Sequence, residues 1–168
     1  MKWIAIIGGA LVLLVVLVAL VGWMQPVKHR VTRQATYRVA AVPLYDLITR
    51  VDAFPSWRTK LTSIEHDSPT RFREIGGNGT ILFERTEQIP AQRVVTRIAD
   101  PSLPFGGSWT YELLPAGDGR TTLRITEDGE VYNPIFRFVS RFVMGHTSTI
   151  DQYLRDVGRY LKEEPAIT

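Results

Sequence analysis

Two side chains in the second half of the chain have the chemistry to hold or transform a ligand, Glu127 and His146. Glu127 lies in a segment where small or apolar residues occupy every second position: Leu123, Ile125, Gly129 and Val131. In a strand this alternation places the carboxyl group on the apolar face. There it must find a partner or have its pKa raised, which suits a ligand anchor or a general acid or base. From the sequence we favour the alternative, a β-bulge near Asp128-Gly129 that turns Glu127 outward.

His146 follows Gly145 on the apolar side of a predicted helix. The pKa of an imidazole suits proton transfer, but a histidine in this position is more often a core residue bonded to a strand carbonyl. The other members of a catalytic constellation are missing. We therefore assign no catalytic residue and keep Glu127 and His146 as the candidates. A glycine inside a helix costs about 1 kcal/mol relative to alanine, so Gly145 indicates close contact with a sheet or a slight bend that opens a pocket.

Aromatic residues are the candidates for lining a cavity around these two groups. With Glu127 and His146, the predicted ligand-binding residues are Trp57, Phe83, Trp109, Tyr111, Phe138 and Phe142. Large aromatic side chains also dominate ordinary cores, so packing alone explains the same positions. Arg97 is a candidate counterion for Glu127, although alternation places it on the opposite strand face from Val94 and Thr96 and so predicts exposure.

Composition excludes several other functions. The 20 Lys and Arg residues nearly balance the 17 Asp and Glu residues without forming a dense basic stripe, so nucleic-acid binding finds no support. The chain has no cysteine, which excludes disulfides and thiolate catalysis. No His, Asp and Glu set has metal-ligand spacing, and no glycine-rich loop carries a phosphate-binding lysine. We expect no metal and no cofactor.

The elements that must position these residues follow from periodicity and turn residues. A strand is predicted over Val31–Val39, followed by a short helix over Leu44–Val51 and a further helical turn from Pro55. Six more strands are predicted over residues 61–67, 71–75, 80–89, 93–99, 108–114 and 120–132. Their short connections require an antiparallel sheet. Asn133-Pro134 begins one long amphipathic helix that ends at Glu163-Glu164-Pro165.

The first 24 residues form a separate segment. Every residue from Ile4 to Gly22 is apolar or glycine, and Trp3 and Trp23 flank the run as they do in membrane spans. A secretory signal peptide is the alternative. The basic residues after the span favour a cytoplasmic globular part: Lys28, Arg30 and Arg33. The predicted organisation is an anchor over 1–24, a linker over 25–30, one domain over 31–164 and a tail over 165–168.

Four local motifs carry a family resemblance. They are Val51-Asp52-x-Phe54-Pro55-x-Trp57, the Pro104–Trp109 segment, the Thr126–Glu130 segment and the C-terminal amphipathic helix. Together they resemble the START/Bet v 1-like superfamily, also called SRPBCC. The stretch from Asn133-Pro134 to Gly145-His146-Thr147 is similar to a bacterial subgroup described as polyketide cyclase/dehydrase and lipid-transport-like. The resemblance implies an α+β helix-grip fold, a curved sheet around a long helix, with an apolar cavity between them.

The resemblance also implies lipids, sterols, polyketides or aromatic compounds as ligands, but it implies no single chemistry. We expect a membrane-anchored protein that binds a hydrophobic or amphipathic small molecule. A cyclase or dehydratase acting in the same cavity is the less favoured alternative. A second alternative is a membrane-tethered interaction domain without a ligand, whose protein partner the sequence does not identify.

Overall fold

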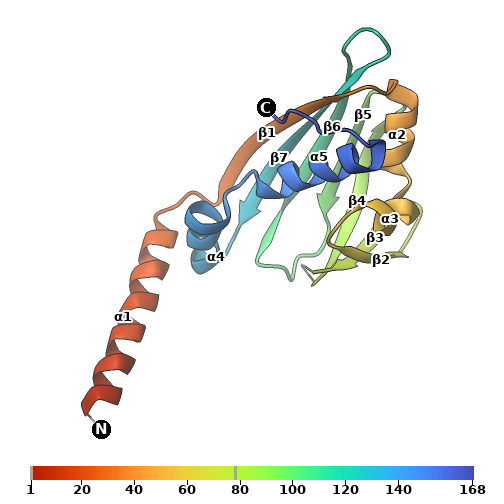
Figure 1. Cartoon of the computed structure of the whole chain (residues 1–168). Helices are drawn as coiled ribbons and strands as arrows, with labels where there is room; N and C mark the ends of the chain where they lie inside the picture. Colours follow the sequence, from red (N-terminus) through yellow and green to blue (C-terminus); the bar gives the residue numbers. More distant parts are fainter. Residues whose placement is uncertain (1, 78) are drawn as a thin grey trace.

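In a computed structural model, which describes residues 2–77 and 79–168, one curved antiparallel sheet wraps around a C-terminal helix (Figure 1). The strands are β1 (Lys28–Tyr37), β2 (Leu61–His66), β3 (Arg71–Gly76), β4 (Gly79–Ile89), β5 (Arg93–Ile98), β6 (Phe105–Pro115) and β7 (Thr121–Val131). They are ordered β1-β7-β6-β5-β4-β3-β2, so the first strand lies beside the last. The predicted α+β class and the antiparallel sheet are confirmed.

The helices are α1 (Lys2–Trp23), α2 (Ala41–Thr49), α3 (Phe54–Trp57), α4 (Pro134–Val139) and α5 (Ser148–Leu161), with a 3-10 turn η1 (Val51–Ala53) and a π-helical turn η2 (Ser140–Met144). The prediction of one long C-terminal helix is wrong. The chain breaks at Gly145, where φ is 74° and ψ is 141°, a backbone conformation that residues with a Cβ rarely adopt. Helices α4 and α5 are therefore separate elements.

The helix α4 begins as predicted at Asn133-Pro134. The Asn133 side chain accepts hydrogen bonds from the backbone N–H groups of Ile135, at 2.9 Å, and Phe136, at 3.3 Å. These are two of the donors that a helix N-terminus leaves without partners. The cap therefore fixes where the chain leaves β7 and turns into α4.

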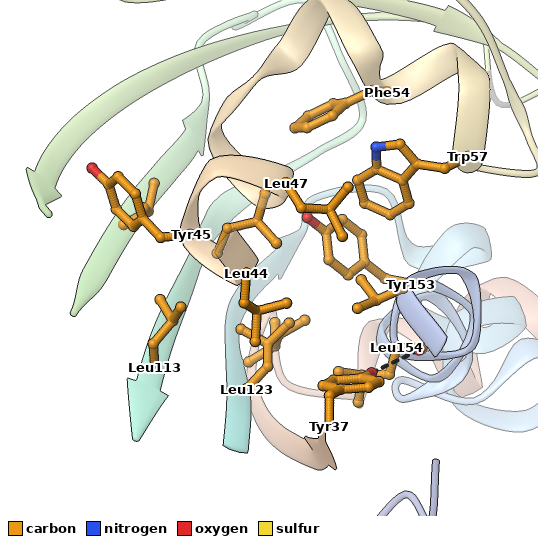
Figure 2. Close-up of a cluster of buried hydrophobic side chains, with 14 of the residues drawn as sticks. Tyr37, Leu44, Tyr45, Leu47, Phe54, Trp57, Leu113, Leu123, Tyr153 and Leu154 are labelled. Atoms are coloured by element: carbon orange, nitrogen blue, oxygen red, sulfur yellow. Dashed lines mark hydrogen bonds between the residues drawn. The ribbon is translucent and has the colours of Figure 1, made fainter. Parts of the chain in front are cut away.

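The hydrophobic core lies between the concave face of the sheet and helices α2, α3 and α5 (Figure 2). Burial of each large apolar side chain contributes roughly 1.5–3 kcal/mol, and Leu44, Leu123 and Leu154 are all fully buried here. The Tyr37 hydroxyl donates a 2.7 Å hydrogen bond to the Leu154 carbonyl, which joins β1 to α5. The core therefore holds α5 in a fixed position across the sheet.

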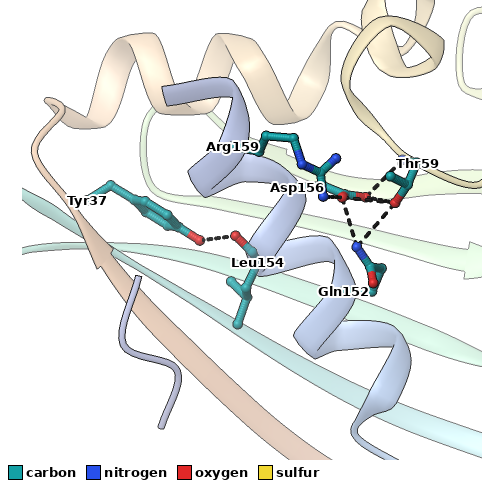
Figure 3. Close-up of polar contacts among 6 residues, drawn as sticks. All are labelled: Tyr37, Thr59, Gln152, Leu154, Asp156 and Arg159. Carbon is teal, nitrogen blue, oxygen red and sulfur yellow. Dashed lines mark hydrogen bonds and ion pairs between the residues drawn. The ribbon is translucent and has the colours of Figure 1, made fainter. Parts of the chain in front are cut away.

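A buried carboxylate ties α5 to the loop after α3 (Figure 3). Asp156, only 3% exposed, accepts hydrogen bonds from both the backbone N–H and the hydroxyl of Thr59. It also accepts from Gln152 at 2.9 Å and from Arg159 at 2.8 Å. Because four donors converge on one carboxylate, this network fixes the distance between α5 and the start of β2.

The helix α1 projects away from the sheet, and its contacts with the domain are mainly with α4 (Figure 1). It is long and apolar enough to cross a membrane, with a mean hydropathy of 3.2 over its most apolar window, and none of that window is buried. A core helix of this domain would be buried, so that explanation fails for α1. A signal sequence passes the same test of length and composition.

The end of α1 packs tightly against α4. A Cβ atom added to Gly22 would lie 1.9 Å from the carbonyl oxygen of Pro134, so only glycine allows this approach. The Arg137 guanidinium of α4 donates to the carbonyls of Trp23 and Gln25, which no further helical turn can satisfy. These contacts fix α4 beside the last turns of α1.

Candidate functional site

Glu127 points to the concave side of the sheet. The strand β7 pairs without a register shift along its whole length, with Glu127 opposite Val31 of β1 and Trp109 of β6. It therefore shares a face with Leu123 and Ile125, both fully buried. The bulge that we expected near Asp128-Gly129 is absent from β7, so the expectation that Glu127 turns outward is wrong.

The two carboxyl oxygens of Glu127 have different surroundings. Oε1 lies 3.3 Å from Nε2 of His29. Oε2 is buried, and within the described part of the chain it has no hydrogen-bond partner. Burial raises the pKa of Glu127 to about 7, and the Trp109 side chain opposes this shift to a smaller extent. The group can therefore both accept and release a proton near neutral pH.

Two imidazole rings complete this group. The rings of His29 and His146 are stacked, with centroids 4.0 Å apart. Burial lowers the pKa of His29. Burial also lowers the pKa of His146, and the neighbouring His29 and Arg141 lower it further. We call Glu127, His29 and His146 the ionisable cluster.

Because Gly129 has no side chain, it leaves space for the ionisable cluster. Gly129 lies opposite His29 in the β1–β7 register. A Cβ at this position would lie 2.3 Å from Cε1 of the His29 ring and 3.0 Å from Oε1 of Glu127. The glycine that suggested a bulge in the sequence therefore serves to accommodate the imidazole.

A cavity of about 280 Å³ lies between the β3–β4 end of the sheet and residues 148–156 of α5, and none of the three cluster residues is among those that line it. Apolar and polar groups both line it, among them Leu61, Ile81, Trp109, Arg58, Glu74 and Gln152. Trp109 belongs to the cavity wall and is the direct cross-strand neighbour of Glu127. The indole is therefore the link between the cavity and the ionisable cluster.

The polar part of the cavity wall is an ion pair. Arg58 forms a salt bridge with Glu74, and both side chains are largely buried. The guanidinium lies 5.2 Å from the ring centres of Phe54 and of Tyr153, a distance at which cations and aromatic faces attract. The Tyr153 hydroxyl is buried close by and has no hydrogen-bond partner among the described residues.

The structure places the predicted aromatic residues in three different environments. Trp109 lines the cavity, and Tyr111 packs against it with ring centres 6.0 Å apart. Trp57 is a core residue, 5% exposed, and Phe83 stacks on Phe72 at the edge of the core. The remaining two are Phe138 and Phe142, which pack on each other, and neither lines this cavity.

Phe138 and Phe142 lie outside the cavity because the chain breaks at Gly145. The break directs α4 and η2 toward α1 instead of along the sheet (Figure 1). Phe142 is 57% exposed. Arg97 bonds to Glu84 at 2.6 Å on the outer face and is no counterion for Glu127.

Sequence reasoning missed His29, which lies among the basic residues that follow α1. The alternation of Val31, Ala35 and Tyr37, extended by one step toward the N-terminus, places His29 on the inward face. That signal was present in the sequence. Its meeting with Glu127, 98 residues away, depends on the pairing of β1 with β7.

The fold and the site define an α+β helix-grip domain of the START type. Solved structures with this fold include a START superfamily protein from Mycobacterium smegmatis, with a TM-score of 0.66 and 13% identity over 80% of this chain and 97% of that one. An aromatase/cyclase from Streptomyces sp. R1128 has a TM-score of 0.65 and 13% identity over 80% and 94%. A norcoclaurine synthase from Thalictrum flavum has a TM-score of 0.65 and 8% identity over 83% and 97%.

The sequence identifies the family more narrowly. The chain belongs to the family described as polyketide cyclase / dehydrase and lipid transport, whose model matches residues 39–149. This confirms the predicted resemblance. No curated protein sequence matches the chain significantly.

Proposed function

We propose that this protein binds a hydrophobic or amphipathic small molecule in the cavity beside Trp109, at a membrane in which α1 is anchored. The observation that carries the proposal is the cavity itself, about 280 Å³ in volume between the sheet and α5. Membership of a family described by cyclisation and lipid transport supports it. The structural likeness to an aromatase/cyclase supports it further.

The cavity wall favours an amphipathic ligand. Its volume is close to the lower end of ligand pockets, which run from roughly 300 to 1,000 Å³, so it suits a small ring system or a short acyl segment. Burial against Leu61, Ile81 and Trp109 contributes about 25 cal/mol for each Å² of apolar surface removed from water. The Arg58–Glu74 pair and the Tyr153 hydroxyl offer hydrogen bonds to the polar end of such a ligand.

A membrane anchor fits this role, because it keeps the cavity where membrane-soluble molecules are concentrated. From Ile4 onward the residues of α1 are apolar or glycine all around the helix, and the domain covers part of only its last two turns. Lys28, Arg30 and Arg33 follow the span and favour a cytoplasmic domain.

The test is to purify the full chain in detergent and identify bound molecules by mass spectrometry of the extract. Ile81→Trp fills the cavity, and Thr80→Trp adds the same bulk one residue away, at an exposed position on the other strand face. We expect a stoichiometric apolar or amphipathic compound with the wild type and Thr80→Trp, and its loss with Ile81→Trp. A wild type without a bound compound, also after incubation with membrane extract, would contradict binding and favour the interaction domain.

A second candidate function, acid–base catalysis on the bound molecule, is favoured by the ionisable cluster. A carboxyl group with a pKa of about 7 beside an imidazole can deliver or remove a proton at neutral pH. Once the extract has supplied the compound, Glu127→Gln separates the two functions. An enzyme loses turnover but keeps the ligand, whereas a carrier with a structural Glu127 shows no turnover in either form.

A further inference from the structure

Four exposed apolar side chains outside α1 lie close together in sequence on α4 and η2. Ile135 is 42% exposed, Phe136 50%, Phe142 57% and Val143 71%. At 100° per residue in α4, Ile135, Phe136 and Val139 lie within about 100° of one another on the helix. Phe142 and Val143, three and four residues after Val139, follow about one turn further along on η2. We call Ile135, Phe136, Val139, Phe142 and Val143 the apolar face of α4–η2.

The opposite side of α4 is occupied by α1. Phe138 and the Pro134 carbonyl both lie within 3.4 Å of a Cβ added to Gly22. Among the residues of α1 whose exposure the structure describes, the less exposed ones lie near the C-terminal end: Val18, Ala19, Val21 and Gly22. The helix α4 therefore lies alongside the last two turns of α1, as Figure 1 also shows.

This placement sets the depth of α4 relative to a bilayer. A tryptophan at the end of a span prefers the headgroup level, and Trp23 has that position in α1. At a rise of 1.5 Å per residue, Val18 lies about 7.5 Å deeper than Trp23 along the helix. An element packed beside Val18–Gly22 therefore cannot remain in the water outside the headgroups while α1 spans the membrane.

We propose that the apolar face of α4–η2 inserts into the headgroup and upper acyl region of the lipid bilayer that α1 spans. This inference rests on the proposed anchoring of α1. The depth matches that of interfacial helices, whose apolar faces are buried about 5–10 Å into this region. Arg141 on η2 is exposed next to Phe142. Its guanidinium suits contact with anionic headgroups.

The insertion brings the ionisable cluster to the membrane surface. Gly145 ends η2 and His146 is the next residue, stacked on His29. The cluster therefore lies directly behind the inserted segment, and Trp109 connects it to the cavity. A molecule that leaves the bilayer beside α4 reaches this end of the domain without crossing bulk water.

The chain contains no cysteine, so each cysteine introduced for the test is the single labelling site. The full-length variants Phe142→Cys, Val143→Cys, Val12→Cys and Thr36→Cys are labelled with an environment-sensitive fluorophore. They are then reconstituted in phosphatidylcholine vesicles with a fifth of phosphatidylglycerol. Thr36 is exposed at the far end of β1 and is the control. Lipids brominated near the headgroup or near the chain end act as quenchers, and circular dichroism checks folding.

We expect the shallow quencher to lower emission roughly twofold at positions 142 and 143, the deep quencher to act at position 12, and neither to act at position 36. Quenching at position 12 with none at 142 and 143 would overturn the insertion while leaving the anchor intact. Absence of quenching at position 12 as well would overturn the anchoring on which the inference rests. The two failures are therefore distinguishable.

Discussion

The Glu127 carboxyl makes stability depend on pH in a direction opposite to that of most acidic residues. Its pKa rises from 4.5 to about 7 on folding because it is buried. The folded domain therefore holds a proton that the unfolded chain releases, and the free energy of unfolding falls as pH rises from about 4.5 to about 7. We expect the wild type to lose about 2–3 kcal/mol relative to Glu127→Gln across this window. Urea unfolding at about pH 5 and pH 8 measures the difference.

The comparison with Glu127→Gln is needed because His29 and His146 change the free energy of unfolding with pH in the opposite direction. Their lowered pKa values cost stability as pH falls below 6.5, and Arg141 adds to this at His146. Both proteins share the contribution of His146, so it cancels in the difference. His29 contacts Glu127, so the difference reports the titration of the Glu127–His29 pair. Parallel pH profiles for the two proteins would show that Glu127 is ionised in the folded state.

The buried Asp156 carboxylate, which lines the cavity, is predicted to stabilise the domain through its hydrogen bonds. Its carboxylate accepts four hydrogen bonds from Thr59, Gln152 and Arg159 (Figure 3). Asp156→Asn turns an amide N–H₂ group toward donors, which costs about 2–3 kcal/mol of unfolding free energy. Asp118→Asn, at a site 89% exposed, is the matched control and should change it by less than about 0.5 kcal/mol. Equal effects of the two substitutions would show that the network does not stabilise the domain.

The role of a residue was harder to predict from the sequence than the strand face on which it lies. Alternation in residues 123–131 correctly indicates the inward face for Glu127, yet a glycine in a strand also marks bulges, and this second signal misled us. Gly129 is present because the His29 ring occupies the space of its Cβ. No local pattern reports a contact that strand pairing makes between positions 98 residues apart.

At the scale of elements, the break at Gly145 can be tested directly. A Cβ here meets nothing within 4 Å, so Gly145→Ala acts only through the backbone conformation. We expect a loss of about 1–3 kcal/mol, measured by urea unfolding. Gly77→Ala, also with free space but without positive φ, is the control and should change stability by less than about 0.5 kcal/mol. A neutral Gly145→Ala would mean that α4 and α5 can form one continuous helix.

Most strands were predictable almost to the residue, whereas β1 and β6 begin three residues before their predicted starts and the C-terminal helix was not predicted correctly. Alternating runs between proline and glycine turns carry strong local signals, and the observed bounds of β3, β4 and β5 differ from the predicted ones by one residue at most. Apolar residues continue at helical spacing on both sides of Gly145. A single glycine costs a helix only about 1 kcal/mol, so the pattern alone could not locate the break. Contact with α1 decides where α4 goes.

At the scale of the whole molecule, Gly22 couples the anchor helix to the domain. Gly22→Val places side-chain atoms against the Pro134 carbonyl, whereas Gly9→Val in the same helix meets free space. We expect Gly22→Val to separate α4 from α1 and to speed hydrogen exchange of the backbone amides of residues 135–139 by about tenfold or more. Gly9→Val should leave exchange unchanged, and the core of the sheet should stay protected in both. Full protection of α4 in Gly22→Val would show that α1 does not hold it.

Because β1 pairs with β7, this pairing cannot form until most of the chain has been synthesised. The contact between His29 and Glu127 spans 98 residues. At roughly 5–20 residues per second, the ribosome takes about 5–20 s to supply the partner strand. Until then β1 presents unpaired N–H and C=O groups, the kind of edge that invites pairing with other chains. The strand joined directly to α1 is thus the first to emerge and waits longest for its neighbour.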